Sequence, residues 1–135
     1  MMRNYDKELI DTGDHKYAYD FDIDVMHPYY MRSMKMFLKS GASLEMGSYK
    51  GQFTKLLKRN VDELDCIEAS SDAVEHCKAD PELKEVKFYN DVFEKVSLPK
   101  KYKNVIITHV LEHLDDRVAV MKKVRNEWLE DNGRF

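Results

Sequence analysis

The most informative segment of the chain is Leu44-Glu45-Met46-Gly47-Ser48-Tyr49-Lys50-Gly51-Gln52-Phe53. It predicts a strand, then a turn with glycine at both ends, then the start of a helix. Glycine tolerates the positive φ angles of tight turns, and the free N–H groups at a helix start can approach a ligand closely. The segment therefore predicts either a nucleotide-type binding turn or a turn that only reverses the chain.

After Gly41 the chain alternates short apolar runs with helical segments, which is the pattern of βα units that build a parallel sheet. The runs predict four strands at Ala42–Met46, Leu64–Glu68, Val86–Tyr89 and Val105–Thr108. Helices are expected at about Gly51–Arg59, Asp72–Lys78 and Asp116–Glu130. Because crossovers between parallel strands are right-handed, these strands should form one sheet with flanking helices, an α/β fold.

The first 40 residues have a different texture and predict an N-terminal arm. Residues 1–24 are rich in Tyr and Asp and show no convincing period, which indicates an arm or a loose helix packed on the rest of the chain. Met26–Lys39 predicts an amphipathic helix with Pro28 in its first turn. Its apolar residues at helical spacing are Met31, Met34, Phe37 and Leu38. We expect this helix to pack on the sheet, with a second unit at residues 41–135.

The composition fits one folded domain. Of the 135 residues 43% are hydrophobic and 35% are charged, and the formal net charge of −3 gives no reason to expect nucleic acid binding. No apolar run approaches the roughly 20 residues of a membrane span. Cys66 and Cys77 show no paired spacing and no basic-then-apolar leader is seen, so we expect free thiols and a cytoplasmic location.

Two carboxylates follow predicted strands. Glu68 ends the second strand 21 residues after Gly47, close to the roughly 20-residue spacing at which an acidic side chain binds a ribose diol. Asp91 follows the third strand, where it could meet the amino group of a base while Val92 and Phe93 pack on the base. A solvated glutamate and a loop-capping aspartate are the alternatives.

Four ordered segments resemble the class I S-adenosylmethionine-dependent methyltransferases, and among these the small-molecule branch. They are Glu45-x-Gly47-x-x-x-Gly51, Glu68, Asp91, and Thr108-His109-Val110-Leu111-Glu112-His113-Leu114. The resemblance covers about residues 26–135. It implies a Rossmann-like sheet, S-adenosylmethionine as cofactor, S-adenosylhomocysteine as product and a small-molecule acceptor.

The resemblance also implies roles for individual residues. The methionine portion of the cofactor would lie on Gly47, Ser48, Tyr49, Lys50 and Gly51, the ribose on Glu68 with Ala69, and the adenine on Asp91 and Val92. His109 and Val110 would line the pocket beneath the cofactor. Glu45 would pair with the cofactor's ammonium or else fix the turn. Such an acidic set suits a cofactor with a sulfonium and an ammonium better than a pyrophosphate dinucleotide.

Two features depart from the pattern of the family. Tyr49 takes the position of the central glycine of the turn, although tyrosine avoids positive φ. The sheet of the family has the order 3-2-1-4-5-7-6, whereas this chain looks truncated after its fourth strand, with residues 132–135 as the start of a fifth. Val105-Ile106-Ile107 would then lie on an edge, so we expect a homodimer through that edge, swapped segments or the N-terminal helix. A fragment of a longer protein is the alternative.

Histidines are the candidate catalytic residues. Methyl transfer from a sulfonium is an in-line displacement, in which a base matters only for a poorly nucleophilic acceptor. His109 and His113 are the candidate bases, although a histidine at position 113 is more often structural. His15 and His27 could close over the cofactor, because an N-terminal segment forms a lid in many relatives. No metal site is expected, since a helical two-histidine site needs i, i+4 spacing and a third ligand.

Two hypotheses follow. The first is a methyltransferase that acts on a small molecule. The second is a truncated methyltransferase fold that binds the cofactor, its demethylated product or a protein partner without turnover.

Overall fold

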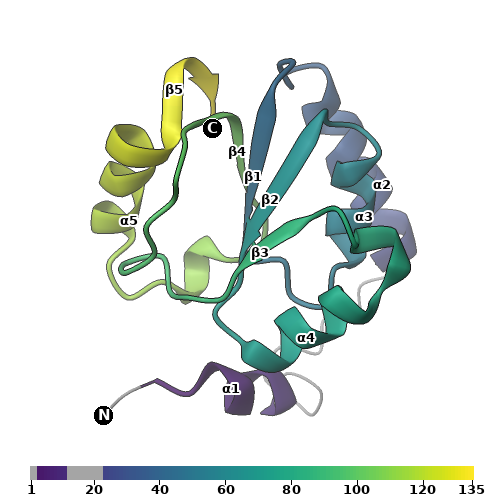
Figure 1. Ribbon diagram of the computed structural model, residues 1–135, viewed down its shortest axis with the longest axis vertical. Helices are drawn as coiled ribbons and strands as arrows, with labels where there is room; N and C mark the ends of the chain where they lie inside the picture. The colour runs from purple at the N-terminus through teal and green to yellow at the C-terminus, as the bar shows by residue number, and fades with distance from the viewer. Residues whose placement is uncertain (1–2, 12–22) are drawn as a thin grey trace.

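The computed structural model describes residues 3–11 and 23–135 and has a five-stranded parallel sheet at its centre (Figure 1). The strands are β1 (Ala42–Met46), β2 (Glu63–Ile67), β3 (Lys87–Tyr89), β4 (Tyr102–Ile107) and β5 (Leu129–Arg134). The α-helices are α1 (Tyr5–Asp11), α2 (Ile23–Lys35), α3 (Gln52–Lys58), α4 (Ser71–Ala79) and α5 (Arg117–Lys123). Short turns of 3₁₀ or π helix lie at Pro81–Leu83, Leu111–His113 and Val124–Trp128. The order β3-β2-β1-β4-β5 confirms the predicted Rossmann-like α/β fold.

Helices cover both faces of the sheet, as Figure 1 shows with α5 on one side and α2 and α3 on the other. Leu44 and Met46 of β1 pack on the α5 side, in a core that contains the buried ring of Trp128. On the other side Met31 of α2 and Cys66 of β2 belong to a second buried cluster. Strands buried on both faces are largely apolar, and β1 and β2 follow this rule with a few polar exceptions that prove important for the site.

The end of the chain differs from the prediction. The helix predicted at Asp116–Glu130 ends at Trp128, and the following six residues form β5. β5 is paired with β4, with Leu129 opposite Tyr102 and Arg134 opposite Asn104. β5 overlaps the predicted start of a fifth strand at residues 132–135 but begins three residues earlier, and because it pairs with β4 the predicted edge position of the fourth strand is wrong. Asn132, at φ 63, lies inside β5, in the stretch between Leu129 and Arg134 where the register with β4 is irregular.

The fourth strand also begins three residues earlier than predicted, at Tyr102. The Tyr102 ring is fully buried, and its hydroxyl donates a hydrogen bond of 2.7 Å to Oδ2 of Asp65 in β2. A tyrosine beside two lysines gave no apolar pattern in the sequence, so the start of the strand was missed.

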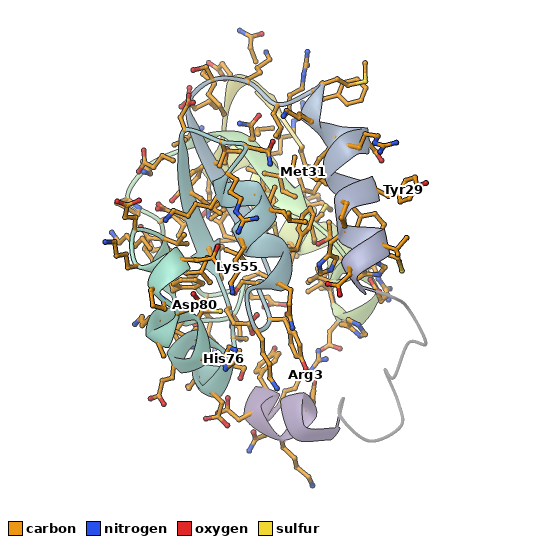
Figure 2. The ribbon with its side chains drawn as sticks, turned by 90° about the vertical axis from the view of Figure 1, so that its right-hand side faces the viewer. Arg3, Tyr29, Met31, Lys55, His76 and Asp80 are labelled. Carbon is orange, nitrogen blue, oxygen red and sulfur yellow. The ribbon has the colours of Figure 1, made fainter. Side chains whose placement is uncertain are left out.

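The helix predicted at Met26–Lys39 is displaced toward the N-terminus, and Pro28 lies inside α2 rather than in its first turn. Met31 is buried as predicted, with 6% of its surface exposed. Phe37 is 59% exposed because α2 ends at Lys35, so its predicted place in the core is wrong. In Figure 2 Tyr29 points away from the body of the protein, whereas Met31 lies on the inner side of the same helix.

Within the described residues no helix is long and apolar enough to cross a membrane. Cys66 and Cys77 are both buried free thiols, which confirms the prediction for these two residues.

Candidate functional site

A cavity of about 440 Å³ lies at the carboxyl ends of β1, β2 and β4. In open α/β sheets ligands bind at this end of the strands, beside the point where the strand order reverses. Here that point is β1, because β2 lies on one side of it and β4 on the other. The cavity walls come from the residues that follow these three strands and β3, from α2 and the start of α3, and from the segment that includes α1.

The structure brings ten of the predicted site residues together around this cavity. They are Glu45, Gly47, Ser48, Tyr49, Glu68, Ala69, Val92, His109, Val110 and His113. Gly51, Lys50 and Asp91 are not part of its lining. Gly51 is the residue before α3, and the Lys50 ammonium lies over the Tyr49 ring, 5.6 Å from its centre. The exposed Asp91 accepts a hydrogen bond of 2.8 Å from the Val92 N–H, the geometry of a loop cap.

The turn after β1 shapes the cavity through its left-handed backbone and its close contact with the segment after β4. Gly47 and Gly51 have φ angles of 80° and 83°, which glycine adopts without cost. A Cβ at Gly47 would lie 2.4 Å from Cγ2 of Val110, so no other residue fits between the turn and the segment after β4. Tyr49 has a φ of 49°, which strains a residue with a side chain. Tyr49 therefore keeps the left-handed backbone of the glycine that it replaces in the family pattern.

Glu68 holds the strained turn in place. Its Oε2 accepts a 2.8 Å hydrogen bond from the Tyr49 N–H, and its Oε1 accepts a 2.9 Å bond from the Ser70 N–H. Burial raises the pKa of this carboxyl, and the backbone N–H bonds oppose the rise. The N–H groups of Ala69 and Ser48 also stabilise the charged form of this carboxyl, which lines the cavity.

Glu45 is a buried acid on the α3 side of β1. Only 1% of its surface is exposed, and its Oε2 accepts hydrogen bonds from Oγ1 of Thr54 at 2.6 Å and from Sγ of Cys66 at 3.4 Å. Burial raises the pKa of Glu45 from 4.5 to about 7, although the two hydrogen bonds oppose this. The carboxyl can therefore gain or lose its proton near neutral pH.

The raised pKa makes stability depend on pH. Between about pH 4.5 and about pH 7 the folded protein holds a proton on Glu45 that the unfolded chain has released, so stability falls as the pH rises. At 1.36 kcal/mol per pKa unit, the loss is on the order of 3 kcal/mol. We expect Glu45→Gln to remove this part of the pH dependence. Urea unfolding of both proteins at about pH 5 and about pH 8 measures it, and equal slopes against pH would contradict the assignment.

Sequence reasoning did not find the contribution of the first residues of the chain. Arg3, Tyr5 and Glu8 line the cavity. The Arg3 guanidinium donates two hydrogen bonds to the Glu8 carboxylate and one, of 2.8 Å, to the carbonyl of His113. Contacts between segments more than a hundred residues apart leave no local pattern, so the sequence carries no sign of them.

Asp6 joins α1 to the start of α4. Its Oδ1 accepts hydrogen bonds from the Ser70 hydroxyl at 2.8 Å and from the Asp72 N–H at 3.3 Å. Ser70 is also the residue that caps α4, as predicted, by accepting a bond from the Ala73 N–H. The α1 segment therefore packs against the residues that directly follow Glu68.

Aromatic side chains gather at the part of the cavity beside α2. His27, Tyr30 and Phe53 pack with ring centres 5.3 to 6.3 Å apart. The hydroxyl of Tyr30 lies 2.7 Å from Nε2 of His109. His27, one of the two predicted arm histidines, therefore lines the cavity, whereas His15 lies outside the described residues. Tyr30 also lines the cavity, as does Phe53, although their sequence patterns predict only a helix and the segment after the turn.

Comparison with known families identifies the fold that carries this cavity. A family model described as "Methyltransferase domain" matches residues 25–135. The chain belongs to this methyltransferase family. The match includes the turn after β1, Glu68 and the segment after β4, so the methyltransferase domain contains most of the cavity wall. Of the residues that line the cavity, Arg3, Tyr5 and Glu8 lie outside the matched residues.

Solved structures show the same fold as this methyltransferase domain. DhpI in complex with SAH has 19% sequence identity and a TM-score of 0.75, over 94% of this chain and 62% of the DhpI chain. The N-methyltransferase NodS from Bradyrhizobium japonicum WM9, in complex with S-adenosyl-L-homocysteine, has 15% identity and a TM-score of 0.70, over 92% and 66%. The glycopeptide N-methyltransferase MtfA has 20% identity and a TM-score of 0.64, over 80% and 53%. The chain thus spans less than two thirds of each of these proteins.

A comparison with curated protein sequences finds no match.

Proposed function

We propose that this methyltransferase domain binds S-adenosylmethionine and transfers its methyl group to a small-molecule acceptor. The observation that carries the proposal is the position of Glu68, whose two oxygens are held by the Tyr49 and Ser70 N–H groups at the edge of the cavity. A carboxylate fixed at the end of the second strand and facing the cavity is suited to accept hydrogen bonds from the two hydroxyls of a ribose. The cofactor-bound neighbours DhpI and NodS support the same reading.

Other residues of the cavity fit the remaining parts of the cofactor. Glu45 would pair with the ammonium of the methionine portion, since a ligand cation favours the ionised form of a buried carboxyl. Val92 and Phe93 would pack on the adenine, with Asp91 retained as its predicted polar partner. Ser48 has a buried hydroxyl without a hydrogen-bond partner among the described residues, and it lines the cavity. An unsatisfied buried hydroxyl beside a cavity is suited to a polar ligand atom.

The bound cofactor would supply a methyl group on a positively charged sulfur. The chain would position the cofactor and the acceptor and exclude water from them. The acidic lining of Glu45 and Glu68 favours a positively charged ligand. His109 and His113 remain the proposed bases, and both line the cavity.

Titration of the purified chain with S-adenosylmethionine and with S-adenosylhomocysteine in a calorimeter tests the proposal. We expect both to bind with micromolar dissociation constants. A well-folded chain that binds neither would contradict the proposal and favour the alternative of a protein partner.

The α1 segment acts as a lid in this proposal, because Asp6 fastens it to Ser70 and Asp72 beside the ribose site. Asp6→Ala should therefore raise the dissociation rate of S-adenosylhomocysteine several-fold, with a smaller effect on the association rate. Stopped-flow displacement measures this rate. The matched control is Lys7→Ala, an exposed neighbour on the same helix, and equal dissociation rates for the two variants would refute the lid.

We also retain the cytoplasm and a homodimer as predictions. Since β4 is paired with β5, the edge that was expected to drive dimerisation is partly covered. Support for a dimer now comes from exposed apolar side chains on and after α2, namely Val25, Tyr29, Met36 and Phe37. Sedimentation velocity at micromolar concentration decides between dimer and monomer.

A further inference from the structure

The contact between Tyr30 and His109 joins two segments that are 79 residues apart. Tyr30 lies on α2, and His109 is the second residue beyond β4. The Tyr30 oxygen is 2.7 Å from His109 Nε2, and the two ring centres are 5.3 Å apart. Both side chains line the cavity. A hydrogen bond this short between a phenol and an imidazole aligns the two groups for proton transfer.

The direction of this hydrogen bond follows from the neighbours of the two rings. Nδ1 of His109 lies 3.9 Å from Oε1 of Glu112, which is too long for a hydrogen bond but within ion-pair distance of a protonated ring. Among the described residues the other acceptor near the Tyr30 hydroxyl is the sulfur of Met26, at 3.8 Å. Sulfur is a weak acceptor and an imidazole nitrogen is a strong one, so Tyr30 donates to His109.

The position of the pair in the sheet places it at one end of the cavity. Ile107 of β4 and Ile67 of β2 are both paired with Met46 of β1, on opposite sides. Glu68 directly follows β2, and His109 is the second residue after β4, so the two residues lie on opposite sides of β1. A ligand whose ribose lies on Glu68 would therefore extend across the turn toward Tyr30 and His109.

The backbone at His109 supports a functional constraint on this residue. Its φ is 53°, in the left-handed region that strains a residue with a side chain. Strain of this kind persists where the surrounding structure requires a particular orientation. Here the strained backbone directs the imidazole toward Tyr30.

We propose that Tyr30 is a catalytic residue that receives the acceptor's proton and passes its own hydroxyl proton to Nε2 of His109. This inference rests on the proposed function. As the acceptor's nitrogen or oxygen forms a bond to the methyl carbon, the carbon–sulfur bond breaks and sulfur keeps its electron pair. The acceptor's proton moves to the Tyr30 oxygen, the Tyr30 proton moves to His109, and the imidazolium that forms faces Glu112. The acceptor must then be an amine or a hydroxyl compound that carries a proton to lose.

The test reads the His109 tautomer in the full chain, without any ligand. The five histidines are labelled with ¹⁵N, His109 is assigned with His109→Gln, and spectra are recorded at a pH above the titration of the rings. We expect Nε2 to be unprotonated and Nδ1 to be protonated. In Tyr30→Phe the pattern should shift toward a mixture of the two tautomers, although the ring and its packing remain.

Tyr29→Phe is the matched control, because Tyr29 is 60% exposed and points away from the cavity side of α2 (Figure 2). It should retain the wild-type pattern. A proton on Nε2 in the wild type, or the same pattern in Tyr30→Phe as in the wild type, would overturn the relay. Failure of the proposed function is read separately, as absence of S-adenosylhomocysteine binding to the wild-type chain.

Discussion

Replacing Glu68 by alanine should weaken the binding of S-adenosylhomocysteine by about 10- to 150-fold. Removal of hydrogen bonds to a charged acceptor costs about 1.5 to 3 kcal/mol, and 1.4 kcal/mol is tenfold in affinity. The same change leaves the N–H groups of Tyr49 and Ser70 without their partner. Because Glu68 holds the strained turn, the variant should also unfold at lower urea concentration. Calorimetric titration and urea unfolding measure the two effects.

Two further variants make this prediction specific. Glu68→Gln keeps one acceptor oxygen and replaces the other with a donor, so its affinity should lie between those of the wild type and Glu68→Ala. Glu75→Ala removes an exposed acid from α4 and should leave binding unchanged. If Glu68→Ala binds as tightly as Glu75→Ala, the ribose assignment is wrong.

Replacing Gly47 by alanine should destabilise the protein by about 2 to 5 kcal/mol. The left-handed backbone costs a residue with a side chain about 1 to 2 kcal/mol, and overpacking costs about 1 to 3 kcal/mol. Both apply here, because the φ of Gly47 is 80° and an added Cβ would lie 2.4 Å from Val110. We expect thermal unfolding about 10 °C or more below that of the wild type, with loss of cofactor binding.

The two causes can be separated by a second change. Val110→Ala in the Gly47→Ala background removes the side-chain atoms that the new Cβ would meet. It should recover the stability lost to the contact with Val110, whereas the cost of the left-handed backbone should remain. Comparison with Val110→Ala alone corrects for the lost packing. A Gly47→Ala variant as stable as the wild type would show that the turn can rearrange.

The parts of the fold that could be predicted are those with local sequence patterns. β1 has its predicted bounds, and the turn, Glu68 and the segment after β4 meet at one cavity as their order along the chain implied. Parallel strands present their carboxyl ends at the same edge, so residues that follow different strands are brought together whatever the loops do. This rule is enough to locate most of the candidate site.

The remaining parts depend on contacts that leave no local trace. The helical period runs on through Trp128 and no helix-stopping residue occurs before Asn132 and Gly133, so the sequence predicts helix at Leu129 and Glu130 and a strand only from residue 132. The α1 segment and Tyr30 contribute to the cavity through partners 64 to 110 residues away. The sequence spacing of these residues does not predict their contacts, because the contacts form only through tertiary packing.

The buried place of Trp128 has a practical consequence for spectroscopy. It is the chain's single tryptophan, 1% exposed, and it lies in the core on the α5 side of the sheet, whereas α2 and the aromatic cluster of the cavity lie on the other. Its emission should therefore follow global unfolding and stay nearly silent when a ligand enters the cavity. An optical titration would need a new fluorophore near Tyr49, and the native one would then serve as an internal reference for foldedness in the same cuvette.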